Sequence, residues 1–224
     1  MAVQLQLSYT EENYLKAIYS LSEKAASFDT STSEIAERIR TKPPTVSDML
    51  RKFRAKKLIS YERYKRVALT KTGKQLAIQV IRKHRLWEVF LHDKLNFSWD
   101  EVHEVAEQLE HIHSEELTLR LDEYLGFPKY DPHGDPIPNA NGEIGESKRA
   151  LLSAVDVGIT CQLVGVKDSS THFLQYLQQI NVGIGTKIKV LEKIAYDNSL
   201  IVSFRKGHQT TVSNKFADNV LVSC

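Results

Sequence analysis

The chain has 224 residues, of which 42% are apolar and 26% are charged, so the composition is that of one or two folded domains and not of a disordered chain. No stretch approaches the roughly 20 consecutive apolar residues of a membrane span, and the N-terminus has no basic flank followed by an apolar run. We therefore expect a cytoplasmic protein without membrane contact. The two cysteines, Cys161 and Cys224, are too few to staple a chain of this length and form no CxxC pair, which argues against a disulfide scaffold and a cysteine-rich zinc module.

Charge is unevenly distributed along the chain, although the formal net charge is only +2. Residues 1–76 carry 15 Lys and Arg against 8 Asp and Glu, whereas residues 77–127 carry 5 against 11. A basic first part suits phosphate groups and an acidic middle part suits cations. We expect the two parts to have different roles.

The first 70 residues predict three helices followed by two short strands. The first helix begins near Thr10, which can cap it, the second covers 33–39 with Ser33 as its cap, and the third covers 43–53 with proline only in its first turn. Residues 58–70 resemble two strands joined by a basic turn. Three helices and a hairpin make a winged helix-turn-helix.

The third predicted helix has the side chains of a DNA-recognition helix, because small polar and basic groups stand near its N-terminal end. The alternative is a solvated helix of a protein-interaction module. A basic wing after the helix pair favours DNA. The residues expected at the groove edges are Thr45, Ser47 and Asp48, and those expected at phosphates are Lys42, Arg51, Lys52, Lys65 and Arg66. Pro44 is also expected to bind DNA.

The middle of the chain predicts three further helices. Thr72 and Gly73 mark a break, a long helix covers 74–95, a second begins near Asp100 with Ser98 as its cap, and a third covers 115–125 and ends at Gly126. Their apolar surface exceeds what the first part can cover, which indicates a homodimer interface.

The last part of the chain predicts a linker and a small barrel. Four of the six prolines and three of the ten glycines lie within 128–145, a composition typical of a linker. Strand-like runs follow at 160–166, 187–191, 200–204 and 219–222, with a helix over 170–179. Short strands at this spacing predict an SH3-like barrel.

The acidic middle part contains the groups best suited to a metal. Glu107, Glu110 and His111 stand at i, i+3 and i+4, which places them on one side of a helix. His103 lies one turn before Glu107, and His84 stands four residues before Glu88. Crowded carboxylates repel one another unless a cation neutralises them, so two cation sites are expected. The alternative is a solvated acidic face.

Six sequence strings together resemble the diphtheria-toxin-repressor family of metal-dependent transcriptional repressors. They occur in the family's order, cover nearly the whole chain, and are specific only in combination. The strings are TEENYLKAIYSL, PPTVSDMLRKF, LTKTGKQLA, RKHRLWEVFL, VHEVAEQLEH and DPHGDPIP.

The resemblance implies a mainly α fold with small β elements. Its parts are a winged helix-turn-helix domain (1–74), a helical metal-binding and dimerisation domain (75–127), a Pro/Gly-rich linker (128–150) and a C-terminal SH3-like (FeoA-like) domain (151–224). It also implies a primary metal site at Asn13, Glu107, Glu110 and His111, and an ancillary site at His84, Glu88, His103, Asp168 and His172.

Two positions bear on the metal. Glu107 stands where iron-responsive members have a cysteine, and Asn13 stands where others have Met or Asp. Lys16 replaces a glutamate of the short manganese members, so the resemblance implies no closely spaced binuclear site. Because a carboxylate suits hard ions, we expect Mn(II), with Fe(II) as the alternative and Zn, Co or Ni binding in vitro.

The expected function is that of a homodimeric repressor that binds palindromic double-stranded operator DNA of metal-uptake genes, with no organic cofactor and no enzymatic activity. A bound ion would join the first helix to the middle helices and fix the two recognition helices about one DNA turn apart. Without metal, the acids would repel one another and leave the DNA-binding part mobile. The alternative is a metal-independent winged-helix regulator that binds a small organic effector. A metalloenzyme would need a nucleophile, an HExxH string or a phosphate loop, none of which accompanies the acids.

Overall fold

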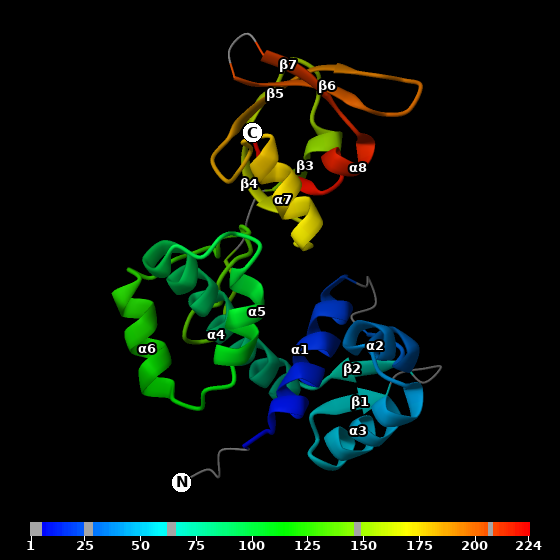
Figure 1. The fold of residues 1–224 in the computed structure, drawn as a ribbon. Coiled ribbons are helices and arrows are strands. Elements are labelled where there is room, and N and C mark those ends of the chain that lie inside the picture. Colours follow the sequence, from blue (N-terminus) through cyan, green and yellow to red (C-terminus); the bar gives the residue numbers. More distant parts are fainter. Residues whose placement is uncertain (1–5, 25–28, 62–65, 146–148, 206–207) are drawn as a thin grey trace. The chain divides into compact units, whose positions relative to one another are not determined.

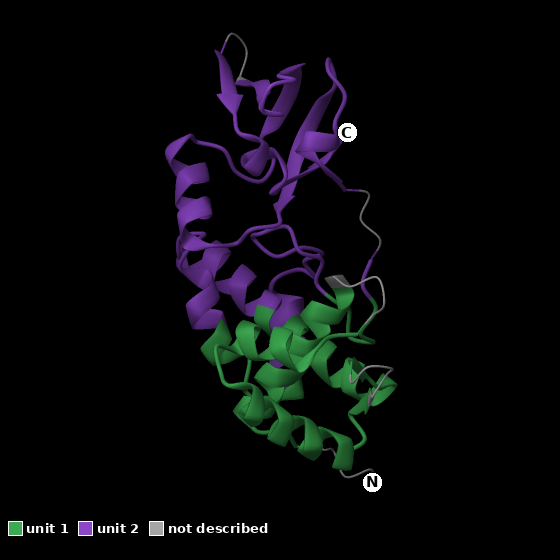
Figure 2. Cartoon of the chain, turned by 90° about the vertical axis from the view of Figure 1, so that its right-hand side faces the viewer, with its two compact units in different colours: residues 1–84, 107–115, 138–143 green, residues 85–106, 116–137, 144–224 purple. Residues whose placement is uncertain are grey.

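The computed structural model describes residues 6–24, 29–61, 66–145, 149–205 and 208–224 (Figure 1). The chain divides into two compact units, each assembled from separate segments (Figure 2). Unit 1 contains Met1–His84, Glu107–Glu115 and Pro138–Glu143, and unit 2 contains Arg85–Ala106, Glu116–Ile137 and Ile144–Cys224. In the described part, no helix is both long and apolar enough to cross a membrane.

Unit 1 has the predicted winged helix-turn-helix. The antiparallel wing strands pair Ile59 with Leu69, and the core of the unit is built from fully buried side chains such as Leu15, Ile35 and Phe53. The elements are α1 (Tyr9–Lys24), α2 (Thr32–Ile39), α3 (Pro43–Ala55), β1 (Ile59–Tyr61), β2 (Val67–Leu69) and the first part of α4 (Lys71–Leu95) (Figure 1).

The helix starts in unit 1 differ from the predicted ones. Helix α2 is capped by Ser31, which forms a capping box with Glu34, so the prediction of Ser33 is wrong. Helix α1 begins at Tyr9, where Ser8 and Glu11 exchange side chain to backbone hydrogen bonds of 2.9 and 3.3 Å in place of a cap at Thr10. A glutamate three residues after a serine closes this reciprocal pair.

Gly73 lies inside α4 and does not break the chain there. A Cβ at this position would lie 2.1 Å from the carbonyl oxygen of Leu58. The absence of a side chain therefore permits a close approach between the start of α4 and the backbone next to β1.

Unit 2 contains the rest of α4, most of α5 (Val102–Leu109) and α6 (Glu115–Tyr124). Leu86, Val89, Leu121 and Ile137 form their buried core. The predicted helices are therefore present, and Gly126 with φ of 75° follows the end of α6 as expected.

The C-terminal part of unit 2 is a six-stranded antiparallel sheet in the order β3-β8-β4-β5-β6-β7, in agreement with the predicted small barrel. The polar strand β7 and the two-residue strand β3 escaped prediction because neither shows an apolar alternation. The elements are β3 (Ala150–Leu151), η2 (Leu152–Ala154), β4 (Thr160–Val166), α7 (Thr171–Gln179), β5 (Lys187–Lys193), β6 (Leu200–Arg205), β7 (His208–Val212), α8 (Asn214–Ala217) and β8 (Val220–Ser223).

The two cysteines form one bridge that the sequence analysis did not predict. Cys161 of β4 is joined to Cys224, directly after β8, across a sequence separation of 63 residues. The register explains the pairing, since the neighbouring residues Gln162 and Ser223 lie opposite each other. The bridge closes the end of the barrel without forming a scaffold for the whole chain.

The segment expected as a linker is packed over part of its length. Asp131 and His133 are buried, and the carbonyl oxygen of His133 accepts a 3.0 Å hydrogen bond from the backbone N–H of Val166 in β4. A Cβ on Gly134 would lie 2.0 Å from the carbonyl oxygen of Val164. The glycine thus permits a tight turn against the barrel.

Candidate metal centre and DNA interface

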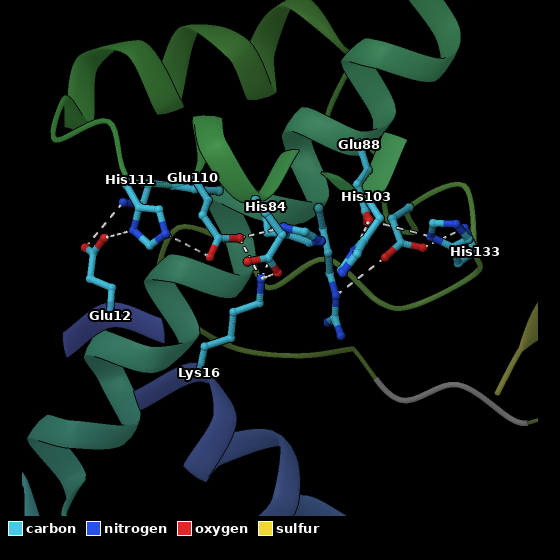
Figure 3. A network of polar contacts seen from close by, with 12 residues as sticks. Glu12, Lys16, His84, Glu88, His103, Glu110, His111 and His133 are labelled. Atoms are coloured by element: carbon cyan, nitrogen blue, oxygen red, sulfur yellow. Dashed lines mark hydrogen bonds and ion pairs between the residues drawn. The ribbon is translucent and has the colours of Figure 1, made fainter. Parts of the chain in front are cut away.

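A cluster of ionisable groups lies within unit 1, where α1, α4 and the end of α5 meet (Figure 3). Helix α5 ends at Leu109, so Glu110 and His111 lie in the following turn and not on the helix as predicted. They nevertheless converge with the side chains of α1. The members of the cluster are Glu12 and Lys16 of α1, His84 of α4, and Glu107, Glu110 and His111.

Glu110 is the central acid of this cluster and is completely buried. Its Oε2 atom lies 2.6 Å from Nζ of Lys16 and 2.5 Å from Nδ1 of His84. Its Oε1 atom lies 3.5 Å from Nε2 of His111 and has no hydrogen-bond partner among the described residues. A buried carboxylate needs such compensating charge, because burial without it favours the neutral acid.

His111 is oriented by a second carboxylate. Its Nδ1 atom lies 2.5 Å from Oε2 of Glu12, and its ring packs on Tyr9 with the ring centres 3.8 Å apart. Glu12 is itself buried, with Nζ of Lys83 3.6 Å away. A carboxylate that accepts from one ring nitrogen leaves the lone pair of the other free for a metal.

Three buried polar atoms of the residues predicted for the primary site have no hydrogen-bond partner among the described residues. They are Oδ1 of Asn13, Oε1 of Glu110 and Nε2 of His111. Leaving such an atom unsatisfied costs about 1–3 kcal/mol, and a divalent cation satisfies amide oxygen, carboxylate and imidazole donors together. The residues present therefore fit a metal ion, and three of the four residues predicted for the primary site contribute these atoms.

A second group of titratable side chains lies within unit 2. Oε1 of the buried Glu88 is 3.3 Å from Nδ1 of His103 and 3.7 Å from Nδ1 of His133 (Figure 3). Nε2 of His133 lies 3.0 Å from the carbonyl oxygen of Trp99, to which it can donate. Glu88, Asp131 and His133 each offer a ligand atom within 4.8 Å of the others.

Asp131 holds the turn that carries this second group. Its Oδ1 atom accepts 2.9 Å hydrogen bonds from the backbone N–H groups of His133 and Asp135, and Nε of Arg85 lies 3.6 Å from Oδ2. Burial raises the pKa of Asp131 to about 7, and the negative charge of Glu88 adds to the effect. Burial alone would lower the pKa of His133, but the hydrogen bond and charge of Glu88 outweigh it and raise that pKa.

Among the residues predicted for the ancillary site, His84 contacts Glu110, and Glu88 and His103 contact each other. Asp168 accepts a hydrogen bond from the backbone of Ser170, and the exposed His172 lies in the first turn of α7. Among the described residues, neither belongs to a group of three closely spaced metal-capable side chains.

Sequence reasoning missed Asp131 and His133 as members of the second group. They stand in the DPHGDPIP string, which carried the resemblance but was assigned to a linker. The residue types did not decide between the two, because Asp and His beside a glycine in a proline-rich stretch occur in tight turns with polar side chains as well as in linkers.

The predicted DNA-contacting residues of α3 are exposed. Lys42 is its N-cap, and Arg51 donates a 3.0 Å hydrogen bond to Asp48 in a pair that solvent screens. Ser47 donates to the carbonyl oxygen of Pro43 at 3.1 Å. Pro44, Thr45 and Lys52 are likewise exposed.

In the wing, the predicted DNA contact Arg66 is engaged in ion pairs. The Arg66 guanidinium is paired with the carboxylate of Asp29, which raises the pKa of Arg66. It also lies 3.7 Å from Glu34. Lys65 lies outside the described residues.

The fold and the site together define a winged-helix protein whose first helix shares a metal-capable cluster with the helix that follows the wing. Three family profiles match the sequence in order: the N-terminal DNA-binding domain of iron-dependent repressors over residues 6–67, their metal-binding and dimerisation domain over 70–139, and the FeoA domain over 150–224. The diphtheria toxin repressor of Corynebacterium glutamicum is 31% identical over 195 residues, which cover 82% of this chain and 84% of that protein. The chain therefore belongs to the iron-dependent repressor family, as the resemblance predicted.

Other repressors are also similar to this chain in sequence or in structure. The iron-dependent repressor IdeR of Mycobacterium tuberculosis is 38% identical over 133 residues, which are 59% of this chain and 57% of that protein's length. A solved structure described as a manganese-dependent transcriptional repressor in complex with manganese is 33% identical, with a TM-score of 0.83 over 95% of this chain and 98% of the other. Relatives named for iron and for manganese are thus both present.

Proposed function

We propose that the protein is a homodimeric, metal-activated transcriptional repressor of the cytoplasm that binds operator DNA of metal-homeostasis genes and catalyses no reaction. The observation that supports metal activation most strongly is the set of buried, unsatisfied donor atoms of Asn13, Glu110 and His111. The matched DNA-binding and dimerisation profiles support the two partners, operator DNA and a second copy of the chain.

In the primary site, Asn13, Glu107, Glu110 and His111 would hold the ion. A bound divalent cation would supply positive charge to the acids and satisfy the donor atoms that hydrogen bonds leave open. Glu12 orients His111, and the apolar side of α1 packs into the same core as α2 and α3 through Leu15 and Ile18. The position of α1 is therefore mechanically linked to that of the recognition helix.

For the ancillary site we propose Glu88 and His103 as ligands. The distance of 3.3 Å between Oε1 of Glu88 and Nδ1 of His103 supports this pair. The remaining residues expected from the resemblance, His84, Asp168 and His172, stay in the proposal as further ligands.

We propose Mn(II) as the activating ion, with Fe(II) as the alternative and Zn, Co or Ni as ions that bind in vitro. The donor set supports a hard or intermediate ion, because it combines carboxylate and amide oxygens with one imidazole and contains no thiolate. The relatives' names agree with manganese and with iron.

We propose that α3 enters the major groove, with Pro44, Thr45, Ser47 and Asp48 near base edges and Lys42, Arg51 and Lys52 at phosphates. We propose a smaller contribution to phosphate binding from Arg66, because its guanidinium is paired with the carboxylate of Asp29. Exposed apolar side chains in unit 2 support the dimer, namely Leu95, Leu117, Leu119, Tyr124 and Phe127. We propose the domain limits 1–74, 75–127, 128–150 and 151–224.

The proposal is tested by selecting bound duplexes from the promoter DNA of the source genome with purified protein and Mn(II). We expect enrichment of palindromic sites that footprint as two half-sites and bind two chains per duplex. The double variant Arg51→Ala/Lys52→Ala should enrich none of them. Failure of the unaltered protein to enrich any duplex with Mn(II) or Fe(II) present would contradict the proposed function.

A further inference from the structure

Lys16 places its ammonium group inside the metal-capable cluster. The residue lies on α1 one turn after Glu12, and only 16% of its side chain is exposed. Its Nζ atom lies 2.5 Å from Oε1 of Glu107, 2.6 Å from Oε2 of Glu110 and 3.2 Å from Nδ1 of His84 (Figure 3). A positive charge thus already lies among groups that a divalent cation would use.

We propose that Lys16 is a built-in competitor of the metal, whose ammonium neutralises Glu107 and Glu110 in the metal-free protein and must leave them when the ion binds. The proposal rests on the proposed function, since it concerns regulation of the same site. It adds that the metal concentration needed for activation is set partly by a residue that is not a ligand.

Charge makes the two cations mutually exclusive. Both carboxylates that the ammonium contacts are expected ligands, and Glu110 is fully buried, so solvent screens the site weakly. An ion bound to the same two acids would place like charges within about 5 Å of each other, where they repel strongly. Two carboxylates balance one ammonium and leave one negative charge, which attracts a divalent ion to the cluster.

The unsatisfied atoms of Glu110 and His111 can make the first contacts with the ion. Oε1 of Glu110 and Nε2 of His111 face each other at 3.5 Å and have no hydrogen-bond partner among the described residues, whereas Oε2 of Glu110 is held by Lys16. The ion can therefore meet two donors before the ammonium leaves. Binding of the ion to Oε1 of Glu107 requires that Lys16 release that atom.

This arrangement bears on one expectation from the sequence. Repelling acids were expected to free the DNA-binding part when no metal is bound. In the structure, Lys16 and the contact between Glu12 and His111 already join α1 to the end of α5 and the turn that follows it. The metal response is then an exchange of cations on α1.

The first test measures Mn(II) affinity by competition with a fluorescent chelator. Lys16→Met should bind Mn(II) at least about fivefold more tightly than the unaltered protein, within the usual range of coupling between two binding events. Lys16→Arg, which keeps the charge, should stay close to the unaltered protein. Lys56→Met is the matched control and should leave the affinity unchanged. Lys56 pairs with Glu11, which lies on α1 like Lys16, and no contact joins Lys56 to an expected ligand among the described residues.

The second test needs no variant. Lysines are acylated in the unaltered protein with and without saturating Mn(II), and modification at each site is quantified by mass spectrometry. Labelling of Lys16 should rise several-fold with Mn(II), while that of Lys56 stays constant.

The outcomes separate the two proposals. If the unaltered protein binds no Mn(II) or Fe(II), the proposed function fails and the role of Lys16 fails with it. If it binds metal while Lys16→Met has unchanged affinity, or if Lys16 labelling ignores the metal, only the competitor role is overturned.

Discussion

Local spacing along the chain predicted some members of the metal-capable cluster but not their partners on α1. The i, i+3, i+4 spacing predicted that Glu107, Glu110 and His111 would converge, and local periodicity is enough for that inference. It could not reveal Glu12 or Lys16 as their partners, because those contacts span sequence separations of 91 to 99 residues. Only the packing of α1 brings them together.

Glu110→Gln should abolish high-affinity binding at the primary site. The change removes a charge that is fully buried beside Lys16 and His84, and we expect Mn(II) affinity to fall about 100-fold or more in isothermal titration. The metal-free variant should also lose roughly 1–3 kcal/mol of stability, since buried partners lose their counter-charge. Glu116→Gln, on an exposed carboxylate of α6, is the control and should change neither. Unchanged Mn(II) affinity in Glu110→Gln would show that the ion binds elsewhere.

At the level of elements, a helix cap and a tight turn are features that the sequence did not predict. Ser31, Thr32 and Ser33 all offer hydroxyls at the start of α2, and the choice among them depends on which serine has Glu34 three residues later. The helices themselves were predictable from apolar spacing. The turn at Asp131 was not, since proline and glycine mark packed turns and free linkers alike.

Ser31→Ala should lower the free energy of unfolding by about 1 kcal/mol, because the Oγ atom that accepts the hydrogen bond from the backbone N–H of Glu34 is lost. Ser33→Ala changes the same residue type inside the helix and should alter stability by less than about 0.5 kcal/mol. Urea denaturation monitored by circular dichroism measures both. A larger loss in Ser33→Ala than in Ser31→Ala would contradict the assigned cap.

The turn at Asp131 should make the metal-free protein less stable as pH rises. The folded-state pKa of Asp131, about 7, lies above its ordinary value of 3.8, so the folded protein binds more protons than the unfolded chain between these values. The raised pKa of His133 acts in the same direction, because its stabilising proton is lost as pH rises through the folded-state pKa.

We therefore expect stability to decline from about pH 4 to about pH 7, and Asp131→Asn to reduce that decline. Denaturation of metal-free protein at a series of pH values tests this. An identical pH profile in Asp131→Asn would show that Asp131 does not titrate in this range.

At the scale of the whole molecule, composition and pattern predicted the architecture and left its assembly open. Winged helix, middle helices and barrel each follow from local spacing, and the family resemblance orders them. The bridge between Cys161 and Cys224 and the meeting of α1 with residues 107–111 depend on contacts between distant segments. Metal control is proposed to arise from the latter contact, because α1 shares its core with α3.

The central claim is that an ion bound through α1 makes the protein competent to bind DNA. The direct measurement is the dissociation constant for a selected operator duplex at one salt concentration, with Mn(II), with Fe(II) under anoxic conditions, and after removal of divalent ions by a chelator. We predict that at least one of the two metals tightens binding about 5- to 150-fold relative to the chelated protein. Equal affinity under all three conditions would contradict the account.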